Sequence, residues 1–183
     1  TQLIRDIIGG EGTNNPFNKV VNIGFNEEGS NDPSRTMSNS STGEYDVRIN
    51  SKDLHVTEAW SYESYSIEEM ETPLFIVVGH ELIHAMNYIT GVYNNIDNFR
   101  VRVVERPGGI IEYYNEEEEE IRTIGGNYYD QGDFNNFSDP SVPLELIEGA
   151  VLKSYDVLYS ENILRAEHFL GERYYHEDTK IER

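Results

Sequence analysis

The sequence predicts an α+β fold that combines a small sheet with helices. Residues 44–50 alternate apolar and polar side chains as a half-buried strand does, and residues 100–114 read as two strands joined by a turn. Residues 73–88 carry an apolar run that ends just before Gly91, a residue typical of helix C-termini. With 183 residues and no cysteine, the chain can bury a core without disulfides, and we expect residues 1–183 to form a single domain.

The first 70 residues are predicted to hold short strands and a long loop. Residues 9–45 are rich in Gly, Asn, Ser and Thr, and the β-branched stretch 19–25 interrupts them as a strand. Residues 27–43 are predicted as a polar loop. In the strand at 44–50, Tyr45, Val47 and Ile49 form the apolar face.

The second half of the chain is predicted to contain a hairpin followed by helices. Its strands are residues 100–105 and 110–114, joined by the turn R-P-G-G at 106–109. Five glutamates at 116–120 then open a segment that carries Ile121 and Ile124 and ends at a Gly-Gly pair. Residues 144–152 and 161–169 are predicted helices, so the C-terminal part is expected to be mostly helical.

Charge and hydropathy exclude two classes of partner. The formal net charge is −20, from 34 acidic and 14 basic residues, whereas nucleic acids and anionic membranes require clustered Lys and Arg. No stretch approaches the roughly 20 apolar residues of a membrane span. The acidity favours a basic partner, and it is equally typical of a protein that simply stays soluble and monomeric.

The segment H-E-L-I-H at residues 80–84 is the main chemical motif. Positions i and i+4 share one face of a helix, so His80 and His84 can bind one ion while Glu81 points at a water bound to it. The chain has only five histidines, which favours a metal motif over a coincidental match on a surface helix. The pattern predicts one Zn²⁺ per chain and hydrolysis of peptide bonds.

Two histidines leave a catalytic zinc one protein ligand short. A run of glutamates is usually a solvated face, but this run ends in Ile121 and Ile124, which indicates that Glu119 and Glu120 turn toward a core. Spacing alone does not choose among the ligands. The rival candidates are a carboxylate of the helix predicted at 144–152 and the remaining histidines: Glu148, His55, His168 and His176.

Residues 119–126 read E-E-I-R-T-I-G-G and resemble the third-ligand motif E-E-L-R-T-F-G-G of clostridial neurotoxin light chains. That motif follows an H-E-L-I-H helix in those peptidases, and its second Glu binds zinc. The resemblance implies that Glu120 is the third ligand, at a similar separation from His84. It also implies that Glu119 orients the metal ligands without binding the metal itself.

Residues 161–167 read E-N-I-L-R-A-E and resemble the E-N-x-L-R-x-E signature of NleD-like bacterial effector metallopeptidases. Arg173 lies at the separation from Glu161 that those effectors use. The resemblance implies that Arg173 stabilises the transition state and that Glu161 supports it, although a carboxylate that offsets a helix dipole explains Glu161 equally well. The light chains place a tyrosine three residues past this arginine. Here that position is His176, so His176 or Tyr175 is expected to polarise the carbonyl.

Together these motifs cover residues 73–176 and imply a zincin-like domain, with a small twisted sheet over the H-E-x-x-H helix. The implied protein is a zinc-dependent endopeptidase of a bacterial effector type, secreted and acting in the host cell cytoplasm. Its implied substrate is a host signalling protein such as a mitogen-activated protein kinase. In zinc peptidases a strand beside the metal helix often pairs with extended substrate, and residues 44–50 are the candidate.

Other classes of function remain open at the level of sequence. The chain could be the metallopeptidase toxin domain of a larger polymorphic secreted protein. It could also be an acidic interaction module with a structural zinc, although such sites usually have four protein ligands. Mimicry of DNA by an acidic surface is supported only by the net charge.

Overall fold

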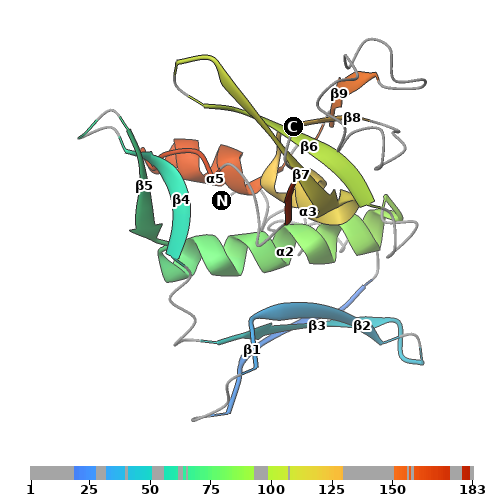
Figure 1. Cartoon of the computed structure of the whole chain (residues 1–183). Coiled ribbons are helices and arrows are strands. Elements are labelled where there is room, and N and C mark those ends of the chain that lie inside the picture. The colour runs from blue at the N-terminus through green and yellow to red at the C-terminus, as the bar shows by residue number, and fades with distance from the viewer. Residues whose placement is uncertain are drawn as a thin grey trace. The chain divides into compact units, whose positions relative to one another are not determined.

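The computed structural model is mixed α+β, as predicted (Figure 1). It describes residues 19–27, 32–39, 41–50, 56–61, 64, 66–92, 99–106, 108–129, 151–155, 157, 159–173 and 179–181. The chain divides into two compact units. The first comprises Thr1–Val56 and Met70–Asn94, and the second comprises Thr57–Glu69 and Asn95–Arg183.

The first unit contains a three-stranded sheet of order β1-β3-β2. The central strand β3 (Glu44–Ile49) pairs in parallel with β1 (Val21–Phe25) and antiparallel with β2 (Arg35–Asn39). Val47 and Ile49 are fully buried, which confirms the alternation predicted for this strand. Because β3 is paired on both sides, its expected role as a substrate-pairing strand is wrong, and among the described residues β1 and β2 are the outer strands of this sheet.

The prediction of a loop over residues 27–43 is wrong for β2. Its sequence R-T-M-S-N offers little apolar surface, and four of its five residues are exposed. This strand is held by its antiparallel ladder to β3, which runs from Arg35↔Arg48 to Asn39↔Glu44. A strand stabilised by pairing at a sheet edge has no hydrophobic alternation to read in the sequence.

The helix α2 (Leu74–Thr90) lies against β2 and β3 of the same unit. The residues from Ile76 to Ala85 are buried, apart from the half-buried Val78, and they include both histidines of the H-E-L-I-H motif. Gly91 ends it in the left-handed conformation, with φ of 70°, and its N–H donates to the carbonyls of Asn87 and Tyr88. The predicted helix and its C-terminal glycine are therefore confirmed.

The second unit contains a five-stranded sheet of order β10-β7-β6-β8-β9. Its centre is the predicted hairpin of β6 (Phe99–Arg106) and β7 (Ile110–Glu117), whose register closes with Arg106 opposite Ile110. The outer strands are β8 (Asn127–Tyr129), β9 (Leu152–Ser154) and β10 (Thr179–Ile181). A separate pair joins β4 (Val56–Ser61) to β5 (Ser66–Glu71).

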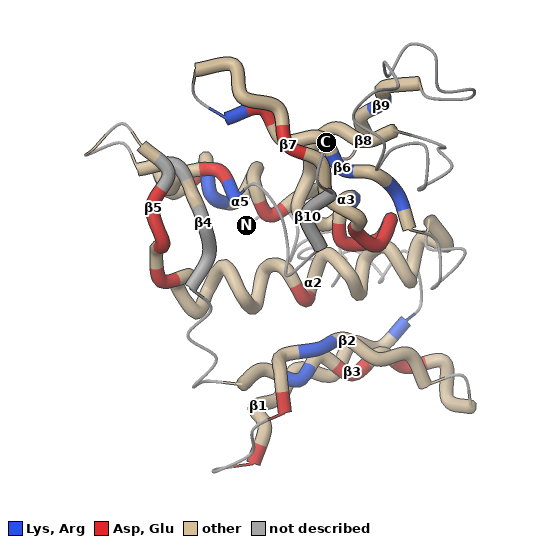
Figure 2. The backbone as a smooth tube through the Cα atoms, in the orientation of Figure 1, with Lys and Arg blue, Asp and Glu red and all other residues tan. Residues whose placement is uncertain are grey.

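Two short helices accompany this sheet, α3 (Glu118–Ile124) and α5 (Glu161–Glu167). The glutamate run is split, because Glu116 and Glu117 end β7 and the remaining three begin α3. Acidic residues therefore gather around the start of α3 (Figure 2). The helix α5 confirms the prediction for residues 161–169.

The expectation of a mostly helical C-terminal part is wrong for the described residues. Beyond Gly126 they form three strands and only one helix. Most of the helix predicted at 144–152 lies outside the described residues, because residues 130–150 are not described. At the end of the predicted range, Leu152 begins the strand β9. Among the helices that the structure describes, none is long and apolar enough to cross a membrane.

Candidate metal centre

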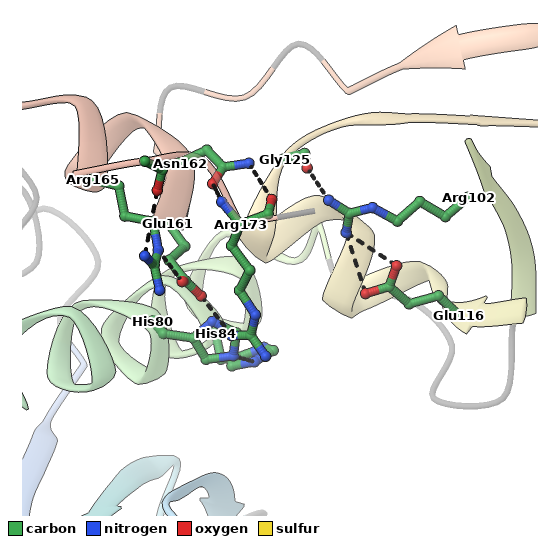
Figure 3. Close-up of polar contacts among 10 residues, drawn as sticks. His80, His84, Arg102, Glu116, Gly125, Glu161, Asn162, Arg165 and Arg173 are labelled. Atoms are coloured by element: carbon green, nitrogen blue, oxygen red, sulfur yellow. Dashed lines mark hydrogen bonds and ion pairs between the residues drawn. The ribbon is translucent and has the colours of Figure 1, made fainter. Parts of the chain in front are cut away.

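The two histidines of the motif share one face of α2. Their Nε2 atoms lie 2.9 Å apart, and both side chains are buried, with 7% of His80 and 8% of His84 exposed (Figure 3). Two imidazole nitrogens bound to one tetrahedral zinc lie about 3.3 Å apart. The helix therefore already holds both rings close to the separation that shared coordination requires.

Glu81 lies beside this pair, and its carboxylate is positioned by the neighbouring sheet. Only 6% of the residue is exposed. The hydroxyl Oγ1 of Thr36, on β2, lies 2.8 Å from Oε2 of Glu81 and 2.7 Å from its main-chain oxygen. A buried carboxylate needs such a donor, because it has lost hydrogen bonds to water.

Glu120 is the third residue that fits a metal. His80, His84 and Glu120 form a group that could hold a metal ion, each offering one ligand atom. Glu120 lies in the first turn of α3 and is half-buried, with its Oε2 atom buried. The two histidines belong to the first unit and Glu120 belongs to the second, so coordination of one ion by all three is part of the proposed function.

The other two glutamates of α3 pair within their own unit. The hydroxyl of Thr123 donates to Oε1 of the buried Glu119 over 3.2 Å, one turn along the helix. Glu118 accepts from Arg122 at 3.4 Å and pairs with Arg100 of β6 at 2.9 Å. The R-T of the E-E-I-R-T motif thus binds the two glutamates that precede Glu120, which explains these residue types without invoking the metal.

Arg102 ties both ends of α3 to the sheet (Figure 3). Its Nη1 donates to both oxygens of Glu116, at 3.2 and 3.0 Å, just before the helix. Its Nη2 donates to the carbonyl of Gly125, just after the helix, at 2.8 Å. No sequence motif indicated a role for Arg102. Glu116 faces Arg100 in the register and lies diagonally across from Arg102, so only the exact pairing of β6 with β7 reveals the contact.

The Gly-Gly pair of the same motif has a steric cause. Gly125 has φ of 88°, and a Cβ there would lie 2.9 Å from Oγ of Ser160. Gly126 has φ of 140°, and a Cβ there would lie 3.1 Å from Nη2 of Arg102. Ser160 is the N-cap of α5, where its Oγ accepts from the N–H of Ile163. Gly125 therefore allows α3 and α5 to approach each other, and Gly126 leaves room for the guanidinium of Arg102.

Glu161 joins two arginines in the interior of the second unit. Its Oε1 accepts from Nε of Arg165 at 2.6 Å, and its Oε2 accepts from Nη1 of Arg173 at 2.8 Å. The carboxylate is fully buried, and both guanidinium groups are nearly so. These charge-assisted hydrogen bonds hold both guanidinium groups in defined positions around one carboxylate.

Asn162 fixes the backbone of Arg173. Its Oδ1 accepts from the N–H of Arg173 at 2.8 Å, and its Nδ2 donates to the carbonyl of Arg173 at 2.9 Å. This amide acts as a strand neighbour would, and a β-bridge to Ala59 of β4 holds Arg173 as well. Glu161 therefore positions the side chain of Arg173, and Asn162 positions its main chain. Asn162 stands inside the quoted signature, so the sequence carried this signal although no role was predicted for it.

Four of the predicted site residues lie outside the described residues. Tyr175 and His176, the expected carbonyl-polarising groups, lie outside the described residues, as do the rival ligands Glu148 and His55. The remaining rival, His168, is exposed at the end of α5, where it forms the C-cap.

The chain was compared with known proteins. No family model, curated protein or solved structure matches it. The interpretation of the site therefore depends on its own geometry and on the short motifs.

Aromatic packing accounts for two tyrosines of the second unit, Tyr128 and Tyr155. Tyr155 stacks on Tyr128 with ring centres 4.4 Å apart, and the guanidinium of Arg122 lies 3.9 Å from the centre of the Tyr155 ring. Burial raises the pKa of Tyr155 well above its usual value of 10.0, and the Glu118 carboxylate raises it further. The Tyr155 ring therefore packs against α3 through Arg122.

Proposed function

We propose that this protein is a zinc-dependent endopeptidase with a zincin-like domain, in which His80, His84 and Glu120 hold the metal. The observation that carries the proposal is the buried His80–His84 pair, 2.9 Å between Nε2 atoms, with the buried carboxylate of Glu81 next to it. Two histidines and one carboxylate are a donor set of catalytic zinc, which keeps its fourth position for water. The sheet that covers α2 within the first unit supports the zincin-like interpretation.

When bound, zinc would supply a Lewis acid and a water activated near neutral pH. Glu81 accepts a proton from the attacking water and later delivers it to the leaving amine. The guanidinium of Arg173, held by Glu161, offers N–H donors to the oxygen on which negative charge develops. Arg102, through Glu116 and the Gly125 carbonyl, holds the helix that carries Glu120, and the hydrogen bond from Thr123 to Glu119 lies within that helix.

The motifs also support a proposal for the biological setting. The E-N-x-L-R-x-E signature favours a secreted bacterial effector that acts in the host cytoplasm on a signalling kinase. The net charge of −20 suits a substrate with a basic docking segment. A toxin domain of a larger secreted protein uses the same site chemistry, and sequence upstream of Thr1 separates these two settings.

The test combines zinc content with a search for new protein termini. Parent protein and Glu81→Gln are purified, their zinc is measured by mass spectrometry, and both are incubated in a host-cell lysate that is then analysed by N-terminal peptide mapping. We expect one zinc per chain in both proteins and new termini with the parent only, because the substitution removes the base and keeps the ligands.

The alternatives give different results. Zinc in both proteins, with no cleavage in lysates from several cell types, would favour a structural zinc in an interaction module. Absence of zinc from the parent would overturn the proposal.

A further inference from the structure

The carboxylate proposed as the general base is held by a residue of the adjacent sheet. Thr36 is the only one of the five β2 residues that is not exposed. Its hydroxyl has one proton to donate and two acceptors within hydrogen-bond distance, the main-chain oxygen of Glu81 at 2.7 Å and Oε2 of the same residue at 2.8 Å. This contact lies entirely within the first unit.

The position of this hydroxyl is well defined. Thr36 pairs with Val47 in the β2–β3 ladder, and Val47 is fully buried. A β-branched side chain on a paired strand has few χ1 rotamers, so the donor has little freedom. Glutamate has three side-chain torsions, and a fixed donor removes most of that freedom from its carboxylate.

We propose that Thr36 is a positioning residue for Glu81: by holding Oε2, it directs Oε1 to receive the proton of the attacking water. In this step an O–H bond of the water breaks as its oxygen bonds to the carbonyl carbon, the carbonyl electron pair moves to oxygen, and the proton passes to Oε1. This inference rests on the proposed peptidase function. It adds a residue of the N-terminal segment, where no motif was found, to the catalytic apparatus.

The experiment compares three variants on one substrate, a quenched fluorescent peptide spanning the cleavage site found by terminal mapping. Thr36→Val keeps the shape and the branch at Cβ but removes the donor. Thr36→Ser keeps the donor. Thr90→Val is the matched control, because the Thr90 hydroxyl donates to main-chain oxygens of Met86 and Asn87 at the exposed end of the same helix.

We expect Thr36→Val to lower kcat about ten-fold or more while KM changes little, since a misdirected base slows the chemical step. Thr36→Ser should keep most of the parent kcat, and Thr90→Val should match the parent. In a Glu81→Gln background, Thr36→Val should lower residual cleavage no further, because its effect passes through the carboxylate. Zinc content should be equal in all variants.

Other outcomes would overturn the inference. Unchanged kcat in Thr36→Val, or an equal loss in Thr36→Ser, would mean that the hydroxyl does not position the base. If Thr36→Val did not fold, the Thr36→Ser protein would decide the question: a folded variant with much reduced kcat would overturn the inference, and one with near-parental kcat would support it. Absence of cleavage by the parent would instead overturn the peptidase proposal, and this role with it.

Discussion

At the scale of single residues, neighbouring glutamates of one short helix have different surroundings. Glu119 accepts from Thr123, and Glu118 pairs with Arg100 and Arg122. Glu120 belongs instead to the group that could hold a metal with the two histidines. Adjacent residues with the same side chain therefore allow a matched test of the ligand.

Glu120→Gln should lose most of the bound zinc, because a neutral amide is a much weaker ligand than a carboxylate. Glu118→Gln, two positions earlier, should keep it. Zinc per chain after dialysis against a weak chelator is the measurement. If both variants retained the metal, the third ligand would have to be sought among the other candidates, starting with Glu148.

At the scale of elements, the buried Arg102–Glu116 pair fixes the helix α3 to the hairpin. Arg102→Met would leave Glu116 charged and fully buried, and such losses cost about 3–5 kcal/mol. Arg100→Met, on the same strand, removes a pair in which both side chains keep about a quarter of their exposure, so about 1 kcal/mol or less is expected. Urea unfolding of the two variants measures the difference.

A second substitution makes this prediction sharper. Adding Glu116→Leu to Arg102→Met removes the stranded charge and should recover most of the lost stability. If the double variant were no more stable than the single one, the contact of Arg102 with the Gly125 carbonyl, rather than the ion pair, would be the main contribution.

The same elements show what the sequence could predict. The helix α2 was predictable because an apolar run, the ligand spacing and Gly91 all agree, and the hairpin was predictable from its turn. The strand β2 was not, because pairing with β3 holds its polar residues in place. Arg102 and Thr36 act through contacts between segments far apart in the chain, and such contacts depend on strand register and helix packing, which one sequence does not specify.

At the scale of the whole molecule, stability should fall in alkaline solution. The raised pKa of Tyr155 means that the folded protein keeps this phenol protonated where the unfolded chain ionises it. Its contribution is fully present below about pH 10 and is lost as the pH rises above that value. The free energy of unfolding should therefore fall less steeply above about pH 10 in Tyr155→Phe than in the parent.

Urea unfolding at a series of alkaline pH values measures this slope, and ultraviolet absorbance of the phenolate reports the ionisation directly. The substitution keeps the ring that stacks on Tyr128, so the two proteins should have similar stability near neutral pH. Parallel slopes in both proteins would show that another group controls alkaline unfolding.

The way Arg173 is held has a practical consequence. Its backbone is fixed by Asn162 and its guanidinium by Glu161, whereas Phe169, in the connection from α5, is 90% exposed. A fluorophore attached at position 169 through an introduced cysteine, in a chain that has none of its own, would sit a few residues from the proposed catalytic arginine without replacing a buried contact. The connection thus offers an optical reporter for following substrate capture in real time.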